Sequence, residues 1–145
     1  SLVAFRVAAD TGALEIMATG KAAERATADD IAALDAMLDR MRAKIAEGDL
    51  LGYSGMNGEF HGAIRRMARH ATAAKLLVQL NSQIVRYQFR SILMPGRVAR
   101  SFVEHEAIVA AIRAHDAPRA RAAMAQHLDE VLDNLRRAIA AQGLD

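Results

Sequence analysis

The sequence Met56-Asn57-Gly58-Glu59-Phe60-His61 combines an amide with an imidazole, and two shorter pairs, Glu104-His105 and Gln126-His127, repeat the imidazole later in the chain. Asn57 and His61 are four residues apart, so on a helix their side chains lie on one face. Apolar residues flank the stretch at the same helical spacing. The sequence therefore predicts a helix that carries an amide and an imidazole toward the same neighbours.

His105 and His127 also lie on apolar stripes. The residues on their faces are Ile108 and Ile112 for His105, and Met124 and Val131 for His127. The three imidazoles therefore point in the same direction as the apolar side chains, which is toward a core. One buried histidine is common, but three of them with an amide one turn away need a shared explanation. We predict that the three stretches build one polar site in the middle of a helical bundle.

The hydrophobic spacing predicts an all-α fold. Apolar residues recur three and four positions apart, as in helices that bury one face. The chain has 2 prolines and 4% aromatic residues, and its apolar residues are mostly alanine, leucine, methionine and isoleucine, so little material for a sheet is present. Six helical segments are predicted, at about residues 2–25, 28–47, 50–69, 72–94, 97–114 and 117–141.

Local signals predict where these helices begin and end. Thr27, with Asp30 three residues later, matches the capping box that opens a helix. Gly48 follows the second segment, where a left-handed C-cap residue is typical. Pro95-Gly96 separates the fourth helix from the fifth. The residues predicted to open the third, fourth and sixth helices are Asp49, Thr72 and Asp116.

Composition limits the function classes. With 145 residues, 52% hydrophobic and 25% charged, the chain fits one soluble domain with a core of its own. Its formal net charge is +2, and its 19 basic residues are interleaved with 17 acidic ones, so no basic stripe for nucleic acid is present. No apolar run approaches the roughly 18–20 residues that a membrane span needs. The absence of cysteine excludes disulfides and thiolate metal sites and suits a reducing compartment, so we expect a cytoplasmic protein.

The three histidines and Asn57 offer a set of donors for a metal ion. Imidazole nitrogens and an amide oxygen suit zinc, nickel or another first-row divalent metal. The alternative is that the histidines are separate buried side chains, each satisfied by the backbone or by a carboxylate. The other two histidines, His70 and His115, are near predicted helix ends, where we expect them to face solvent or to cap a helix.

Several motifs of the chain occur in the same order in a known family. They are Arg6-x-x-x-Asp10, Ala23-Glu24-Arg25-Ala26-Thr27, Asn57-x-x-Phe60-His61, Pro95-Gly96-Arg97, Glu104-His105-x-x-Ile108-x-x-Ala111-Ile112 and Ala122-Ala123-Met124-x-x-His127-Leu128. Each motif is short, but the ordered set spans nearly all of residues 1–145. On these motifs the chain resembles the FCD domain, the C-terminal effector-binding domain of the FadR subfamily of GntR transcriptional regulators.

The resemblance implies a single antiparallel helical bundle that senses a small molecule, belongs to a homodimer and is not an enzyme. It also implies an N-terminal winged helix-turn-helix domain, absent from this chain, through which alone the regulator binds DNA. In metal-binding members an aspartate and three histidines hold a divalent metal, and the matching positions here are Asn57, His61, His105 and His127. We expect zinc ahead of nickel or another first-row metal. Asn57 stands where aspartate is usual, and a neutral amide is a weaker donor to a hard cation.

Four further polar residues are candidates for binding the effector, which we expect to be a small carboxylate. Arg6 lies on an apolar stripe and its guanidinium suits a carboxylate, although a plain ion pair with Asp10 is the alternative. Asn81 and Gln88 lie inside the apolar stripe of the fourth helix, where they need partners in the effector, in the backbone or in each other. Arg90 lies on the flank of that stripe.

Two other functions remain open at the level of the sequence. A three-histidine site with an open position can activate water in a hydrolytic or redox metalloenzyme, for which Glu104 or Glu59 would be the base. Glu59 is offset from His61 by about 200° around a helix, so we expect it to point outward. The other function is a dimerisation module whose histidines are purely structural. A winged helix-turn-helix segment encoded upstream would favour the regulator.

Overall fold

The structure is a computed structural model that describes the backbone of residues 2–141 and the side chains of residues 10–80 and 89–141. Throughout residues 2–141 the regular secondary structure is helical, which confirms the predicted all-α fold. The six helices are α1 (Leu2–Arg25), α2 (Ala28–Glu47), α3 (Leu50–Met67), α4 (Ala71–Ile92), α5 (Arg97–Arg113) and α6 (Ala117–Ala141). Across the described residues, no helix combines the length and the hydropathy that crossing a membrane requires.

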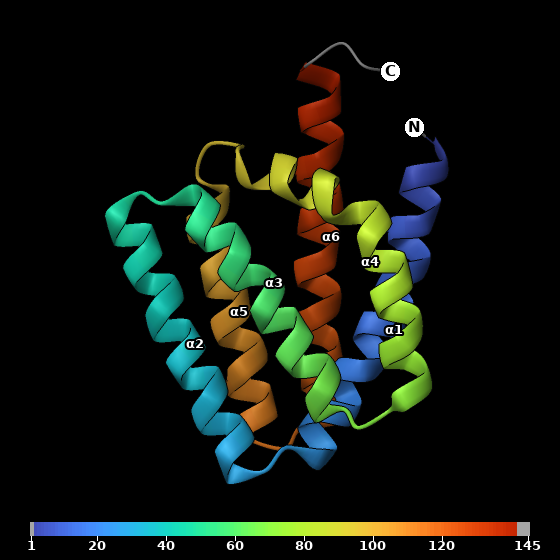
Figure 1. Ribbon diagram of the computed structural model, residues 1–145, viewed down its shortest axis with the longest axis vertical. Coiled ribbons are helices and arrows are strands. Elements are labelled where there is room, and N and C mark those ends of the chain that lie inside the picture. The colour runs from blue at the N-terminus through green and yellow to red at the C-terminus, as the bar shows by residue number, and fades with distance from the viewer. Residues whose placement is uncertain (1, 142–145) are drawn as a thin grey trace.

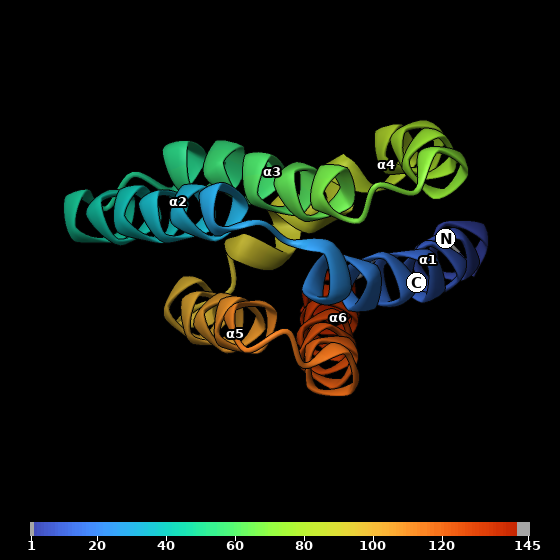
Figure 2. The same ribbon diagram turned by 90° about the horizontal axis from the view of Figure 1, so that it is seen from below.

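The helices run alternately up and down and form two layers that are closed along one side (Figures 1 and 2). α2 and α3 pack side by side in one layer, and α5 and α6 pack side by side in the other. α1 packs against both α6 and α4 and closes the bundle away from α2. The last turns of α4 cross one end of the bundle before the chain turns at Pro95-Gly96 into α5. This is the predicted antiparallel bundle.

α2 and α3 carry the caps that the sequence predicts. The Asp30 N–H donates to Thr27 Oγ1 at 3.1 Å, and the Thr27 N–H donates to the Asp30 carboxylate at 2.9 Å. Gly48 ends α2 with a φ of 68°, in the left-handed region that favours glycine. The Gly52 N–H donates to the Asp49 carboxylate at 2.8 Å and so caps α3. Each such cap satisfies a backbone donor and typically stabilises the fold by about 1 kcal/mol.

Four helix boundaries differ from the prediction by one or two residues, among them the end of α4 at Ile92 rather than near residue 94 and the end of α5 at Arg113 rather than near residue 114. α3 ends at Met67 rather than near residue 69, and Arg69 takes a positive φ of 48°. α4 begins one residue before Thr72, because its N-cap is His70, whose Nδ1 accepts a hydrogen bond from the Ala73 N–H at 3.2 Å. A ring nitrogen here takes the place of the hydroxyl or carboxylate oxygen that usually caps a helix. All of these differences are within the ordinary uncertainty of one or two residues at helix ends.

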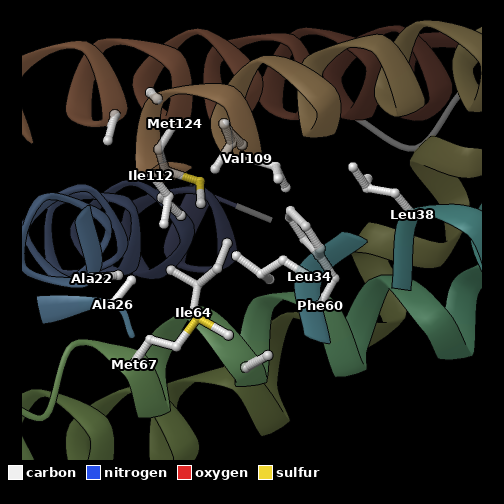
Figure 3. Packing of buried hydrophobic residues seen from close by; sticks show 14 of the residues in the cluster. Ala22, Ala26, Leu34, Leu38, Phe60, Ile64, Met67, Val109, Ile112 and Met124 are labelled. Carbon is white, nitrogen blue, oxygen red and sulfur yellow. The ribbon is translucent and has the colours of Figure 1, made fainter. Parts of the chain in front are cut away.

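The core lies between the two layers (Figure 3). Its fully buried members include Leu34 from α2, Phe60 from α3, Ile112 from α5 and Met124 from α6, all at 0% exposure. Truncating a buried aromatic side chain such as Phe60 to alanine costs about 3–5 kcal/mol. The ring centre of Phe60 is also 4.5 Å from that of His105. The packing that stabilises the fold therefore also restrains one of the imidazoles.

Candidate metal centre

Three histidines from three helices meet in the interior. His61 comes from α3, His105 from α5 and His127 from α6, and their exposed fractions are 6%, 0% and 2%. The ring centres are 5.6 Å apart for His61 and His105, 5.3 Å for His61 and His127, and 4.7 Å for His105 and His127. The structure thus brings together the three imidazoles that the sequence assigns to apolar stripes.

The spacing of the ring nitrogens fits a single metal ion. Each histidine offers one nitrogen, and these three atoms lie within 4.8 Å of one another. Three atoms that close share a centre no more than about 2.8 Å from each of them, against about 2.0–2.1 Å for a zinc–imidazole bond. Side-chain adjustments of less than about 1 Å would therefore bring all three nitrogens to bonding distance.

Burial keeps two of the rings neutral, which is the form that binds a metal. Burial lowers the pKa of His61 well below its ordinary value, and the charges of His127 and Arg65 lower it further. The pKa of His105 is also well below its ordinary value, first because of burial and then because of neighbouring charges. A neutral imidazole keeps a lone pair on one nitrogen, so both rings can donate to a cation.

His105 has one ring nitrogen without a partner. Its Nε2 is buried and makes no hydrogen bond, whereas its Nδ1 lies 3.4 Å from the hydroxyl of Tyr53. That hydroxyl donates to Ser101 Oγ at 3.0 Å. Burial raises the pKa of Tyr53 to about 12, so the hydroxyl keeps its proton. Leaving a buried polar atom unpaired costs about 1–3 kcal/mol, and a metal bound to Nε2 would remove that cost.

His127 is held by a carboxylate that is itself held by an arginine. Its Nδ1 lies 2.7 Å from Glu104 Oε1. Arg97 donates to both oxygens of the same carboxylate, from Nη1 to Oε2 and from Nη2 to Oε1, at 2.7 Å each. Burial acts to raise the pKa of Glu104, but the hydrogen bonds from His127 and Arg97 bring it below its ordinary value. Glu104 is therefore an ionised carboxylate with both oxygens engaged.

Asn57 lines a small cavity beside the histidines. The cavity has a volume of about 20 Å³, which is room for about one water molecule or one ion. His61, His127, Ser91 and Arg97 form further parts of its wall. Oδ1 of Asn57 and Oγ of Ser91 are buried and make no hydrogen bond with the residues that the structure describes. With Nε2 of His105, the interior thus holds three unpaired polar atoms close to one set of metal-binding side chains.

Arg65 lies one turn beyond His61 on the same face of α3, although it is not among the residues predicted from the sequence. Its Nε donates a hydrogen bond to Glu15 Oε1 on α1 at 2.8 Å, and its Nη2 forms an ion pair with the same oxygen at 2.7 Å. The two side chains are only 12% and 6% exposed. The spacing of four residues from Asn57 to His61 and again to Arg65 is the signal that identifies it.

The other predicted residues take different positions. The predicted effector residues whose side chains lie outside the described residues are Arg6, Asn81 and Gln88. Arg90 is half-buried in the last turn of α4, and it does not line the cavity. Arg97 lines the cavity without having been predicted as a binding residue. Glu59 is exposed and lies 3.8 Å from Arg40, so it points outward as the sequence predicts.

The two histidines outside the group of three lie at helix ends, as predicted. His70 is the N-cap of α4. His115 follows α5 with a φ of 53°, and its Nδ1 is 2.8 Å from the carbonyl oxygen of Ala23. His115 therefore ties the turn between α5 and α6 to α1.

Comparison with solved structures shows the same architecture in two other proteins. McbR/YncC of E. coli is similar with a TM-score of 0.81 and 21% sequence identity, over 91% of this chain and 63% of that one. A GntR protein of Streptococcus agalactiae is similar with a TM-score of 0.73 and 23% identity, over 88% of this chain and 59% of that one. This chain therefore spans less than two thirds of the length of either. No curated protein matches it.

The sequence itself matches a family over most of its length. The model of the FCD domain matches residues 11–130. This range contains Asn57, His61, His105 and His127, as well as Arg97 and Glu104 beside them. The bundle, the sequence motifs and this match agree, and the chain belongs to the FCD domain family.

Proposed function

We propose that this chain is the ligand-sensing domain of a GntR-type transcriptional regulator of the FadR subfamily, and that it binds a small organic acid at a divalent metal inside its bundle. The observation that carries the proposal is the convergence of three buried imidazole nitrogens within 4.8 Å of one another. The FCD match and the similar fold of a protein named GntR support the regulatory part.

The metal would be held by His61, His105 and His127, with the amide oxygen of Asn57 as a further donor or a close neighbour. Nitrogen-rich donor sets of this kind suit zinc, and also nickel and other first-row metals. The unpaired Nε2 of His105 and Oδ1 of Asn57 support such an occupant. When bound, the ion supplies a Lewis-acidic centre for an oxygen of the effector.

Charge favours an anionic effector. Three neutral imidazoles and a neutral amide leave the two positive charges of a divalent metal uncompensated. Glu104 does not offset them, because its negative charge is already balanced by the guanidinium of Arg97, which donates to both of its oxygens. A carboxylate bound to the metal would offset these charges. Hydroxy acids, dicarboxylates and sugar acids are therefore the candidate classes of effector. The side chains proposed to complete the effector site are Arg6, Asn81, Gln88 and Arg90.

The size of the cavity links effector binding to a change of shape. About 20 Å³ is too small for an organic acid. Ser91 and Ile92, at the end of α4, form part of the wall, so an effector that reaches the metal has to displace this turn. The turn leads into α5, which carries His105. A ligand shifts an equilibrium toward the arrangement that it binds best, so effector binding would repack α4 against α5.

The carboxylates near the histidines favour sensing over hydrolysis or redox catalysis. A general base must lie within hydrogen-bond reach of the proton that it removes. Glu104 has both oxygens engaged, and Glu59 is exposed on the surface beside Arg40. Of the two bases that the sequence offers, neither is therefore available to a water molecule on the metal.

DNA binding belongs to a part of the regulator outside this chain. The chain spans 63% and 59% of the lengths of the two similar structures. We assign DNA binding to a winged helix-turn-helix domain N-terminal to it, in a cytoplasmic homodimer. Repacking of α4 and α5 would then change the spacing of the two DNA-binding domains.

Isothermal titration calorimetry tests the effector. Zinc-loaded and chelated protein would be titrated with malate, tartrate, succinate and gluconate, and with neutral and acyl-chain ligands as comparison. Binding of an acid to the zinc-loaded form and its loss after chelation is expected, because a ligand on the metal is thermodynamically linked to it. Binding that ignores the metal, or a preference for the neutral or acyl-chain ligands, contradicts the proposal.

The variant Asn57→Asp tests the charge argument. An added carboxylate at this position should raise the affinity of the protein for the metal and lower its affinity for the organic acid. Gln126→Glu is the matched control, because it adds the same charge at an exposed position next to His127. The control should change neither affinity appreciably. The opposite pattern in Asn57→Asp would mean that Asn57 is not at the metal.

A further inference from the structure

We infer that Arg97 and Glu104 are positioning residues for the metal centre: Arg97 fixes the carboxylate of Glu104, and Glu104 fixes His127 in the tautomer whose Nε2 is free to bind a metal. This inference rests on the proposed metal site. It goes further in assigning distinct roles to two residues that are not ligands, and in explaining how ligands from α5 and α6 are held in register.

The contact with Glu104 determines which ring nitrogen of His127 carries the proton. Its Nδ1 lies 2.7 Å from Glu104 Oε1, and an ionised carboxylate only accepts hydrogen bonds. Nδ1 must therefore carry the ring proton. In a neutral imidazole this leaves the lone pair on Nε2, so one contact sets both the tautomer and the orientation of the ring.

Arg97 keeps the carboxylate of Glu104 from binding the metal itself. A free glutamate next to a metal could bind it directly. Glu104 is prevented from doing so, because Arg97 donates a hydrogen bond of 2.7 Å to each of its two oxygens. Arg97 is 1% exposed and Glu104 13% exposed by side chain, so water hardly competes. Arg97 therefore makes Glu104 the partner of a ligand rather than a ligand.

The contacts of Glu104 with Arg97 and His127 join α5 to α6. Arg97 is the first residue of α5, and Glu104 lies two turns further along the same face. His127 belongs to α6. The chain of contacts thus ties the ligand on α6 to the helix that carries His105. His105 itself has a weaker partner, the Tyr53 hydroxyl at 3.4 Å, so the orientation of His127 should be the more sensitive of the two.

The zinc affinities of four variants test these roles, with a competing chelator as the reference. Glu104→Met removes the acceptor and should weaken zinc by about 10–100-fold, the usual loss for such partners. Glu104→Gln keeps an oxygen acceptor and should therefore lose less zinc affinity than Glu104→Met. Arg97→Lys keeps the positive charge but cannot donate to both carboxylate oxygens in the same way. Its zinc affinity should lie between those of the two Glu104 variants. Glu106→Gln on the exposed face of α5 is the matched control and should bind zinc as the unaltered protein does.

The tautomer of His127 is the readout that a merely structural role would not move. In metal-free protein with ¹⁵N-labelled histidine, long-range ¹H–¹⁵N correlation should show His127 protonated at Nδ1, and this preference should disappear in Glu104→Met. Circular dichroism would establish that the variants fold, and the unaltered protein answers the question even if one does not. Protonation at Nε2 in the unaltered protein, or undiminished zinc affinity in Glu104→Met, overturns the inference.

The proposed metal site and the positioning roles can fail separately. If His61→Ala binds zinc as well as the unaltered protein does, the three-histidine site is wrong. The tautomer of His127 in metal-free protein does not depend on that result. It would still show whether Glu104 controls the ring.

Discussion

Tyr53 on α3 and His105 on α5 form a buried pair in which the tyrosine hydroxyl lies 3.4 Å from Nδ1 of the imidazole. The two rings are nearly parallel, at 19°, with centres 6.4 Å apart. The same hydroxyl donates to Ser101. With Nδ1 facing Tyr53, Nε2 is the nitrogen of His105 left for a metal. Tyr53 therefore restrains this ring as Glu104 restrains His127, but through a longer contact.

Tyr53→Phe is expected to weaken zinc binding by about tenfold, the lower end of the loss that follows removal of a ligand's hydrogen-bond partner. The free energy of unfolding should fall by about 1–3 kcal/mol, because the buried contacts of the hydroxyl with Ser101 and His105 are both lost. Chelator competition and urea unfolding measure the two effects. Ser101→Ala removes only the other partner of the hydroxyl and serves as the control. Equal zinc affinity in Tyr53→Phe would show that the hydroxyl does not orient His105.

The metal-free protein should lose stability as the pH falls. The folded-state pKa values of His61 and His105 lie below the ordinary value of 6.5, so the unfolded chain takes up protons first. Each ring therefore contributes stability that is complete above 6.5 and is lost as the pH drops from there through the lower folded-state value. Urea unfolding across this range measures the loss, and zinc should oppose it until protons displace the metal.

Two variants assign this pH dependence. His105→Gln removes one of the buried titrating rings and should flatten the decline in the free energy of unfolding below 6.5. His70→Asn keeps a good N-cap for α4 and should leave the decline as it is. A decline that is equally steep in His105→Gln would mean that other groups cause it.

The ion pair of Glu15 and Arg65 should be costly to break but not to replace. Glu15→Leu leaves a nearly buried guanidinium without its partner, which typically costs about 3–5 kcal/mol. Burial raises the pKa of Glu15 despite the opposing effect of Arg65, so the pair does not fully offset the cost of burying the carboxylate. The double variant Glu15→Leu, Arg65→Met should therefore recover most of the loss in urea unfolding.

An exposed pair gives the comparison. Arg113 and Asp35 join α5 to α2 with side chains 51% and 47% exposed. Asp35→Asn should cost less than about 1 kcal/mol. If Glu15→Leu costs as little as Asp35→Asn, the buried pair is not a structural element of the interior.

This chain alone should not bind DNA with useful affinity. Its formal net charge is +2, and many of its arginines are paired with acids, whereas phosphate-driven binding needs clustered cations. A gel-shift titration at low salt measures this. Tight, sequence-selective binding by the chain alone would require a DNA-binding surface on the bundle itself.

The helices and the direction of the histidines were predictable because both depend on local spacing. Thr27 and Asp30 cap α2 through contacts three residues apart, and the periodicity of α3 places His61 inside. His70 shows the limit of this. Its ring nitrogen caps α4 in place of Thr72, which has the usual capping residue type, and only the course of the backbone decides between them.

The network around the histidines was not predictable in the same way. Glu15 and Arg65 are far apart in the sequence, and their contact depends on how α1 packs against α3. Arg97 and Glu104 are two helical turns apart, so a shared face could be predicted, but the approach of His127 to the same carboxylate depends on the packing of α5 with α6. Spacing identifies faces, and packing decides which faces meet.

Metal analysis of tag-free protein tests directly whether the three histidines bind a metal ion. After exposure to zinc and removal of the excess, the unaltered protein should retain one ion per chain. His61→Ala, His105→Ala and His127→Ala should each lose it, and His70→Ala should keep it. The proposed metal site would be contradicted if the unaltered protein retained no zinc, nickel or other divalent metal. It would also be contradicted if none of the three substitutions lowered the metal content.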